Sequence, residues 1–425
     1  SVMTMGADGA PVTADGRLTH PPICWQCRRT EPVAERLADS IGRRRLYEIT
    51  GYHVIRFNTL FALAWLRKNA PEALDDAKCW MMMAGLLSHR LCGEMSIDYP
   101  GASTMMAMDL RQRTWSEKLL ALADLEAGFF PRFVESGGTI GTVTAEASAA
   151  TGIPEGTPVT AAGHDTQFAP IGSGVQPGEA ILSTGTWEIL MVRVPEFTPN
   201  DEGFEGGLII EFDALPGLYD PQLLMMGSGV IEWLAKHFYG ELESSPQLYE
   251  TMIREAHLCD AGSGGVMLLP SFVAGTGPTK GWNTLGTVLG LTISTERGQV
   301  YRAALEGLCC QLQLAIEMLE SATGASPEGI RVVGGGSKND LWNQLRAEVT
   351  GLPVTTIEQK EATVLGAAIC AFAGTGVHES VEAAQRAIRF GETTFQPSAD
   401  RGDYEALYAR YKALLPALEP HYSGP

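Results

Sequence analysis

The sequence predicts an α/β protein with two domains, and three observations support this prediction. The chain has 425 residues, of which 45% are hydrophobic and 19% are charged, so it can bury more than one core. β-rich segments follow one another at 180–183, 187–194, 207–212 and 222–226, with turn signals between them. Strand and helix patterns alternate from residue 296 onwards, which is typical of a sheet with parallel strands.

The first domain, residues 1–171, is predicted to be rich in helices. Residues 57–69 (FNTLFALAWLRKN) have the pattern of an amphipathic helix with a basic end, and residues 79–91 that of an apolar helix closed by Gly93. A short buried strand follows Pro154. We expect a loop after that strand and then a helix from Gln167.

The second domain is predicted to span residues 172–425, because the pattern changes to strands after Gly172 and Gly174. Its later part alternates helices and strands, with helices expected at 296–319, 339–349, 362–373 and 404–418 and strands at 330–333 and 354–357.

The charge balance excludes several classes of partner. The 50 acidic residues outnumber the 31 basic ones and give a formal net charge of −19, which would repel nucleic-acid phosphates and anionic membranes. No apolar run approaches the ~20 residues needed to span a bilayer. We therefore expect a cytoplasmic protein with a small-molecule substrate, and neither a nucleic-acid nor a membrane partner.

The eight cysteines are too sparse for a disulfide framework, so reduced thiols are expected. Cys24 and Cys27 form one CxxC pair, but the chain offers no second pair and no HxxxH partner for a zinc site. We interpret them as cysteines of a pocket wall or core.

Gly163-His164-Asp165-Thr166 places an acid at the carboxyl end of a predicted strand, where open α/β sheets bind their ligands. An aspartate there can accept a proton from a hydroxyl group. The alternative is that Asp165 is the N-cap of the following helix.

Two glycine turns could surround phosphates. In Leu182-Ser183-Thr184-Gly185-Thr186-Trp187, backbone N–H groups and a hydroxyl group could hold a phosphate, and the alternative is an ordinary β-hairpin. Val333-Gly334-Gly335-Gly336-Ser337 follows a strand and precedes a helix, as nucleotide-binding turns do. The chain has no GxxxxGK[ST] motif. It also has no GxGxxG motif, which argues against an NAD-dependent oxidoreductase.

Taken together in this order, these segments resemble the FGGY family of carbohydrate kinases, and within it the fuculokinases. The matching segments are AAGHDTQFA, LSTGTWEILMVR, YRAALEGL and VVGGGSKNDLWNQ, and FNTLFALAWLRKN matches too, except that Ala62 stands where the family usually has Lys. The resemblance implies the two-domain, actin/hexokinase-like (ribonuclease H-like) fold with a cleft between the domains. It also implies transfer of the γ-phosphoryl group of ATP, with Mg²⁺, to a sugar hydroxyl group.

The resemblance also implies roles for individual residues. Asp165 would be the general base. Thr186 and Gly185 would belong to a phosphate loop, and Gly335, Gly336 and Asn339 would lie around the adenosine. The residues expected to contact the sugar are Asp8, Trp25, Arg29, Phe57, His164 and Thr166. Trp25 as a core residue, Arg29 as a surface charge and Phe57 as a helix-packing residue remain alternatives.

The implied substrate is the C1 hydroxyl group of L-fuculose or a related ketose, with rhamnulose or xylulose as alternatives. Kinases of this family begin with a strand and a DxGxT-like turn, and nothing before Ser1 supplies them here. We therefore expect the sequence to be incomplete at its start. A strand edge left open there would favour a homodimer. A different class of function is a catalytically silent, actin-like module that binds a sugar or a nucleotide.

Overall fold

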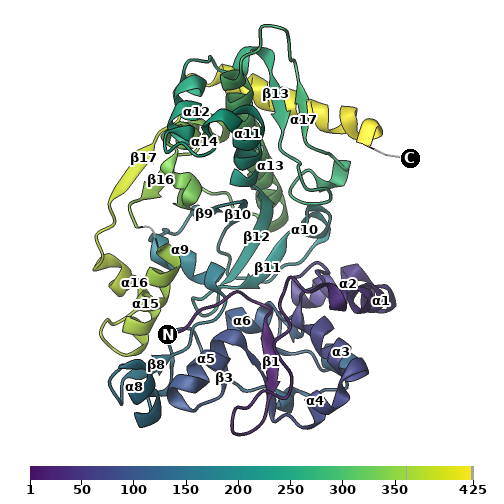
Figure 1. The fold of residues 1–425 in the computed structure, drawn as a ribbon, viewed down its shortest axis with the longest axis vertical. Helices are drawn as coiled ribbons and strands as arrows, with labels where there is room; N and C mark the ends of the chain where they lie inside the picture. The colour runs from purple at the N-terminus through teal and green to yellow at the C-terminus, as the bar shows by residue number, and fades with distance from the viewer. Residues whose placement is uncertain (360, 423–425) are drawn as a thin grey trace.

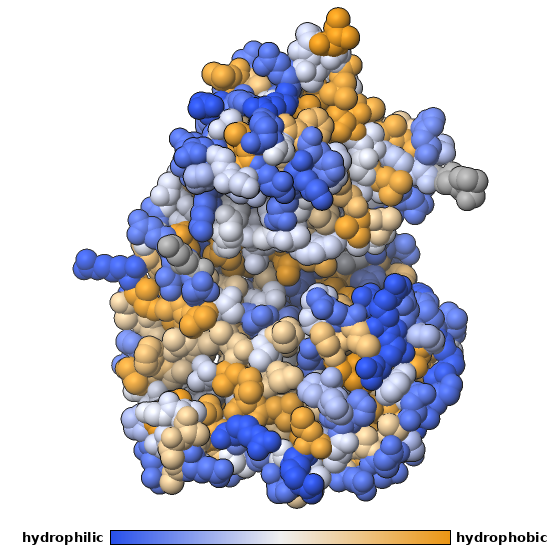
Figure 2. Space-filling view, in the orientation of Figure 1, coloured by the Kyte–Doolittle hydropathy of each residue, from blue (hydrophilic) through white to orange (hydrophobic). Residues whose placement is uncertain are grey.

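The computed structural model describes residues 1–359 and 361–422, which form two halves stacked along the long axis of the molecule (Figure 1). The first part of the chain, purple to blue, forms the lower half, and the teal to green segments form most of the upper half. In Figure 2 the outline of the molecule is indented at the right, where the halves meet.

The lower half is built from short strands and helices. Its strands pair in small two-stranded sheets. The helices are α1 (Glu31–Ile41), α2 (Arg43–Thr50), α3 (Thr59–Asn69), α4 (Pro71–Asp75), α5 (Met83–Cys92), α6 (Tyr99–Ser103), α7 (Glu117–Leu120) and α8 (Ala145–Thr151). The strands are β1 (Gly9–Val12), β2 (Cys79–Met82), β3 (Ser96–Ile97), β4 (Met108–Asp109), β5 (Thr114–Trp115), β6 (Arg132–Phe133), β7 (Thr139–Thr142) and β8 (Pro158–Thr160).

The helix predicted over residues 79–91 begins later than expected. Its first four residues form strand β2, which pairs antiparallel with β1, and α5 starts only at Met83. A short apolar run suits a buried strand as well as a helix, and here the partner strand β1 decides between them. Gly93 ends α5 in the left-handed conformation, as predicted.

The upper half is organised around a seven-stranded sheet with the order β11-β12-β10-β9-β15-β16-β17. The pairs β9–β15 and β15–β16 are parallel and the other pairs are antiparallel. The strands are β9 (Glu179–Thr184), β10 (Trp187–Met191), β11 (Ile209–Phe212), β12 (Tyr219–Met226), β15 (Gly329–Gly334), β16 (Val354–Ile357) and β17 (Glu392–Phe395), and β13 (Met267–Leu269) with β14 (Thr287–Leu289) forms a separate pair.

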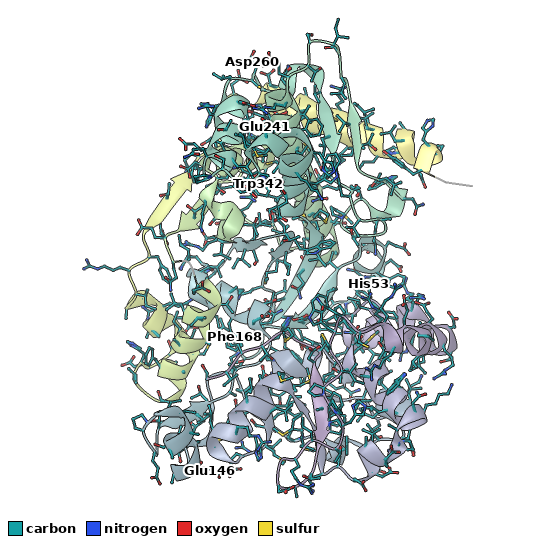
Figure 3. The ribbon with its side chains drawn as sticks, viewed as in Figure 1. His53, Glu146, Phe168, Glu241, Asp260 and Trp342 are labelled. Carbon is teal, nitrogen blue, oxygen red and sulfur yellow. The ribbon has the colours of Figure 1, made fainter. Side chains whose placement is uncertain are left out.

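The 27-residue helix α13 (Arg297–Thr323) is buried along much of its length and packs against α14 (Asp340–Thr350) and β12. Its start is closed by a capping box between Glu296 and Gln299. Trp342 of α14 lies in the upper half (Figure 3). The other helices of this half are α10 (Asp201–Gly206), α11 (Ser228–Phe238), α12 (Leu248–His257), α16 (Val381–Arg386) and α17 (Gly402–Tyr422).

Helices α9 (Ala169–Ser173) and α15 (Ala362–Gly374) pack unusually closely through small residues. A Cβ atom on Gly172 would lie 1.7 Å from the Ala362 carbonyl oxygen, and one on Gly366 would lie 1.9 Å from the Phe168 carbonyl oxygen. The small-residue helix predicted at 362–373 is thus observed, and its composition is explained by this contact. The helix expected from Gln167 begins as a 3-10 turn at Asp165 (Asp165–Phe168) and continues as α9.

Contacts between the halves run through the middle of the molecule. The Ile210 amide donates to the Gly51 carbonyl oxygen, and a Cβ on Gly51 would lie 2.3 Å from the Ile210 oxygen. His53 and Phe168, labelled in Figure 3, also lie near this boundary. The largest apolar cluster contains residues from both halves. The boundary predicted between residues 171 and 172 falls inside α9 and stays a prediction.

Within residues 1–359 and 361–422, no helix combines the length and the apolar character that crossing a bilayer requires.

Candidate active site

A cavity of about 200 Å³ lies between the two halves. The lower half contributes loop residues and Thr166 of a 3-10 turn, and the upper half contributes residues of strands β10, β11 and β12. The lining residues are Met5, Gly6, Ala7, Trp25, Tyr52, Ile55, Phe57, Thr104, His164, Thr166, Ile189, Ile209, Glu211, Gln222 and Leu224. Four of the six residues predicted to contact the sugar are among them, namely Trp25, Phe57, His164 and Thr166.

One face of the upper sheet forms the floor of this cavity. Ile189 of β10 is directly opposite Leu224 of β12, and Ile209 of β11 is directly opposite Gln222. Alternate residues of a strand point to the same face, so these four side chains share one surface with Glu211. The floor therefore combines three aliphatic side chains with one amide and one carboxylate.

Two aromatic side chains form a wall of the cavity. The Trp25 and Phe57 rings meet edge to face, with centroids 6.2 Å apart. Trp25 is 41% exposed, so the alternative that it is a core residue is wrong. Phe57 precedes α3 by two residues and lines the cavity. Asp8 is buried behind this wall, where its Oδ1 accepts the Trp25 amide at 2.9 Å, and burial raises its pKa.

Arg29 lies outside this lining. Its Nε donates to the Cys27 sulfur at 3.0 Å, and its guanidinium carbon lies 5.1 Å from the centre of the Trp65 ring. Arg29 is exposed, as the surface-charge alternative states. Cys24 is exposed too, so it is not a core residue, and it does not line the 200 Å³ cavity, whereas Cys27 is partly buried against the core.

The turn before β1 is held in a strained conformation beside the cavity. Ala7 has φ +68°, which is uncommon for a residue with a side chain. Its amide donates to Thr104 Oγ1 at 2.9 Å and its carbonyl accepts Thr59 Oγ1 at 2.6 Å. Such strain persists only where neighbouring contacts enforce it, and it is concentrated at functional sites.

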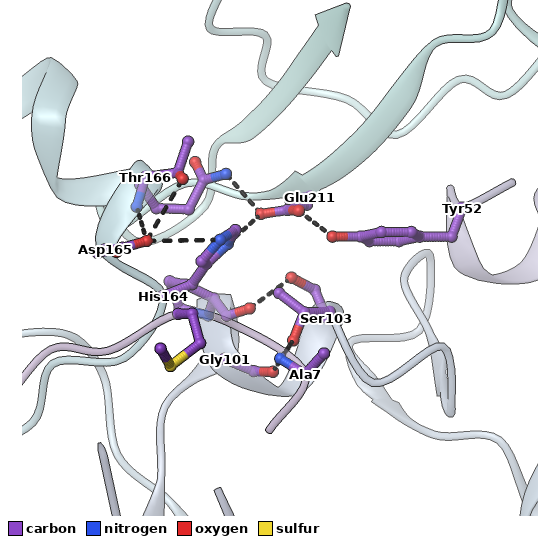
Figure 4. A network of polar contacts seen from close by, with 12 residues as sticks. Ala7, Tyr52, Gly101, Ser103, His164, Asp165, Thr166 and Glu211 are labelled. Atoms are coloured by element: carbon purple, nitrogen blue, oxygen red, sulfur yellow. Dashed lines mark hydrogen bonds and ion pairs between the residues drawn. The ribbon is translucent and has the colours of Figure 1, made fainter. Parts of the chain in front are cut away.

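A buried polar network joins the halves at the inner end of the cavity (Figure 4). Glu211 accepts hydrogen bonds from the Tyr52 hydroxyl group, from His164 Nδ1 at 2.9 Å and from Gln167 Nε2 at 2.5 Å. Burial alone would lower the pKa of His164, but the charge and hydrogen bond of Glu211, with Asp165 and Asp98, raise it to about 9. His164 is therefore an imidazolium at neutral pH.

Asp165 lies at the edge of this network. Its side chain is 47% exposed, and its Oδ1 is 3.7 Å from His164 Nε2. The same oxygen accepts the Thr166 amide at 2.8 Å. The N-cap of the following turn is His164, although the contact between Asp165 and Thr166 also satisfies an amide at the start of that turn. Asp165 is not among the residues that line the cavity described above.

Asp98 is a buried acid close to the same network. Its carboxylate accepts the Gly101 amide as N-cap of α6, and burial raises its pKa to about 6. A Cβ on Gly163 would lie 1.9 Å from Asp98 Oδ1. Glycine at 163 thus lets the segment between β8 and His164 pass close to this carboxylate.

The two predicted phosphate turns lie side by side at one sheet edge. Strands β9 and β15 are parallel and Gly334 pairs with Thr184, so the turns that follow them leave from the same edge. Gly334 has φ +95°. A Cβ on Gly336 would lie 2.3 Å from Thr184 Oγ1, whereas one on Gly335 would meet nothing within 4 Å. The first turn, Gly185–Thr186, also connects the β9–β10 hairpin, so the hairpin alternative describes the same geometry.

Asn339 starts helix α14 and is fixed from two sides. Its side chain accepts the Trp342 amide at 3.1 Å as the N-cap and donates to the Tyr301 hydroxyl group at 3.1 Å. The predicted nucleotide residues Gly185, Thr186, Gly335, Gly336 and Asn339 are thus grouped around the carboxyl ends of two parallel strands. Thr186 and Gly335 are exposed there and do not line the 200 Å³ cavity.

Several residues of the cavity were missed by the sequence analysis. Glu211, Tyr52, Gln222 and Thr104 line it, but each lies in an ordinary strand, helix or loop pattern with no motif around it. For Glu211 the sequence does offer a signal, because it is a charged residue within the apolar run of β11, and a buried acid must have polar or charged partners. Over the described residues, no group of three or more His, Cys, Asp or Glu side chains could hold a metal ion.

Comparison with known proteins gives matches over most of the chain. The family model described as the N-terminal domain of the FGGY family of carbohydrate kinases matches residues 1–172, and the model of the C-terminal domain matches residues 180–375.

Curated relatives match over similar lengths. The L-fuculokinase of Salmonella typhi is 39% identical over 401 residues, which cover 94% of this chain and 82% of that protein. The L-fuculokinase of Escherichia coli (strain K12) is 38% identical over 400 residues, with the same two coverages. The autoinducer-2 kinase of Enterobacter sp. (strain 638) is 26% identical over 408 residues, which cover 92% of this chain and 76% of that protein.

Solved structures share the fold. The xylulose kinase from Rhodospirillum rubrum matches with a TM-score of 0.89 and 24% identity over 100% of this chain and 85% of its own. The glycerol kinase from Plasmodium falciparum, solved with ADP, matches with a TM-score of 0.86 and 21% identity over 97% of this chain and 82% of its own. These likenesses confirm the predicted two-domain, actin-like α/β fold.

Proposed function

The chain belongs to the FGGY family of carbohydrate kinases, and on this premise we propose that it phosphorylates L-fuculose or a closely related deoxyketose, at the C1 hydroxyl group. As a carbohydrate kinase it is a phosphotransferase that uses ATP. The relatives that match at 38–39% identity are L-fuculokinases, and this supports the choice of sugar.

One observation in the cavity supports a deoxysugar. Three aliphatic side chains, Ile189, Ile209 and Leu224, share the floor with the amide of Gln222 and with the Glu211 carboxylate, which already accepts three hydrogen bonds within the protein. A methyl group at the end of a deoxyketose would bury apolar surface on this floor, at roughly 25 cal/mol per Å². A hydroxyl group placed against these aliphatic side chains would lose hydrogen bonds to water without regaining them. Xylulose, which has no such methyl group, is therefore the weaker candidate.

In the proposed reaction Asp165 accepts the proton of the attacking hydroxyl group. That O–H bond breaks, the sugar oxygen forms a bond to the γ-phosphorus, and the bond from the γ-phosphorus to its bridging oxygen breaks and releases ADP. Asp165 is half exposed and ionised carboxylates accept protons, so its chemistry suits this role. The sugar would be oriented by His164, Thr166, Trp25 and Phe57. Asp8 would fix Trp25 through the hydrogen bond from the Trp25 amide, and Arg29 would lie beside the segment that carries Trp25.

The nucleotide would bind at the adjacent turns of the upper half. Gly185 and Thr186 would face the phosphates, and Gly335, Gly336 and Asn339 the adenosine, since open space beside Gly335 leaves its backbone accessible. Mg²⁺ binds proteins largely through substrate phosphates, so we treat it as part of the MgATP substrate. A cytoplasmic location, a homodimer and the two domain ranges 1–171 and 172–425 stay predictions.

A coupled assay of ADP release with a panel of ketoses tests the proposal. We expect the highest kcat/KM with L-fuculose, a lower value with rhamnulose and the lowest with xylulose. Equal rates with xylulose and L-fuculose would contradict the proposed sugar. Sugar binding without ADP release from any ketose would favour the silent binding module.

A further inference from the structure

Glu211 is a buried acid whose partners come from both halves of the molecule. Its side chain is 2% exposed on β11, and it accepts hydrogen bonds from Tyr52, His164 and Gln167. A carboxylate at this depth is stable only with a charged partner and satisfied hydrogen bonds. His164, at 2.9 Å, carries the opposite charge and belongs to the segment that carries Asp165.

The surroundings of Glu211 favour its ionised form. Burial raises its pKa, but His164 and the three hydrogen bonds lower it more, and the net shift is downward. Asp220, directly opposite on β12, has a pKa raised well above its usual range by burial and by Asp213. Tyr52 is likewise held neutral by burial and by Glu211. Asp213 is paired with Arg193 at 2.5 Å.

Two further acids face His164 from other elements. Asp165, at the start of the 3-10 turn, has its Oδ1 3.7 Å from Nε2, and the charge of Asp98, which precedes α6, also raises the pKa of the ring. Glu211 alone among these acids accepts a hydrogen bond from Nδ1 in the described structure. The Nδ1 contact fixes the ring orientation and leaves the Nε2–H side turned towards Asp165.

We propose that Glu211 is a positioning residue for phosphoryl transfer: it holds the His164 ring as a charged donor whose Nε2–H faces the Asp165 carboxylate. This inference rests on the proposed function, in which Asp165 is the base. His164 keeps its own proton throughout, and Asp165 takes the proton of the sugar hydroxyl group. The charged His164 ring attracts the Asp165 carboxylate and so limits its movement. Because the ring is itself hydrogen-bonded to Glu211 of β11, the position of Asp165 depends on the upper half, which carries the phosphate turns.

The first measurement needs no variant and no turnover. NMR titration of ¹⁵N-labelled histidine follows the His164 ring in the free protein. We expect it to lose its proton near pH 9, with Nδ1 hydrogen-bonded throughout. A His164 ring that titrates at or below the ordinary value of about 6.5 would overturn the proposal, whatever the ADP-release assay shows.

The second measurement compares variants of similar shape. Glu211→Gln keeps an acceptor for Nδ1 but removes the charge, and Tyr52→Phe removes a different hydrogen bond to the same carboxylate and keeps the His164 contact. Profiles of kcat and KM against pH are measured for each, together with the NMR titration.

We expect the alkaline fall of kcat to lie near pH 9 in the unmodified protein and in Tyr52→Phe. In Glu211→Gln we expect this fall to move to a pH lower by at least about one unit, because burial lowers the pKa of His164 once the Glu211 charge no longer raises it. We also expect kcat of Glu211→Gln at pH 8 to be reduced about 10- to 100-fold, by analogy with the loss that follows removal of the hydrogen-bond partner of a metal-bound histidine. An unmoved alkaline fall, or a rise in KM alone, would make Glu211 a structural or sugar-contacting residue and overturn the proposal. Absence of ADP release from the unmodified protein would instead count against the proposed function.

Discussion

Replacing Arg346 with methionine should destabilise the part of the upper half that carries the phosphate turns, namely β9, β10 and α14. Arg346 of α14 and Glu188 of β10 form an ion pair at 2.5 Å, and each side chain is only 1% exposed. The guanidinium group also donates to Asn343 Oδ1 at 2.8 Å and lies 3.9 Å from the centre of the Trp342 ring. The ion pair therefore connects α14, which follows the glycine turn at 334–337, to the β9–β10 hairpin, which contains the turn Gly185–Thr186.

The size of the effect follows from the burial of Glu188. Methionine fills much of the arginine volume but leaves the Glu188 carboxylate without its charged partner, which typically costs about 3–5 kcal/mol. Replacing both residues, with Glu188→Leu added to Arg346→Met, removes the unpaired charge and should restore most of this loss. Lys412→Met is the control, since its pair with Glu317 is exposed and contributes at most about 1 kcal/mol.

Hydrogen exchange measured by mass spectrometry reports this loss locally. We expect amides in β9, β10 and α14 to exchange roughly 10²- to 10⁴-fold faster in Arg346→Met, since about 1.4 kcal/mol corresponds to a factor of ten. Amides of α3 in the lower half should be unchanged. Exchange in Arg346→Met no faster than in Lys412→Met would refute the reasoning, and so would a double variant as unstable as the single one.

Two further predictions concern the turns and the cavity floor. Gly336→Ala should lower the melting temperature and raise KM for ATP, because its Cβ would lie 2.3 Å from Thr184 Oγ1, whereas Gly335→Ala, with nothing within 4 Å, should leave the melting temperature unchanged. Equal melting temperatures for the two variants would contradict the steric argument. Leu224→Thr should reduce kcat/KM for L-fuculose about 10- to 200-fold, and the loss should be smaller for a ketose with a terminal hydroxyl group. A uniform loss over the ketose panel would contradict a methyl-binding floor.

Much of the upper half could be predicted because its local patterns agree with its tertiary structure. The strand at 354–357 was predicted with its observed bounds, and the helices at 339–349 and 362–373 end within one residue of the prediction. The predicted strand at 187–194 ends early, at Met191. Residues 79–82 were wrongly assigned to a helix, because only the pairing with β1 selects a strand there.

The cavity residues also divide into those that the sequence could indicate and those that depend on tertiary contacts. Trp25, Phe57, His164 and Thr166 could be proposed from motifs along the chain, and all four line the cavity. Glu211 could not, because its partners Tyr52 and His164 are 159 and 47 residues away in the sequence. Such a contact is created by the packing of the two halves and leaves no local pattern. The roles assigned to all of the site residues, including the sugar contacts of these four, are still predictions.

The most direct test of the account is the turnover of Asp165→Asn. The variant keeps an oxygen for the Thr166 amide, and the half-exposed side chain contributes little to the packing, so the melting temperature and the calorimetric Kd for L-fuculose should stay close to those of the unmodified protein. Loss of a general base typically lowers the rate 10²- to 10⁴-fold, so we expect kcat for ADP release to fall by that factor. A variant with near-normal kcat would contradict the assignment of Asp165 as the base of this sugar kinase.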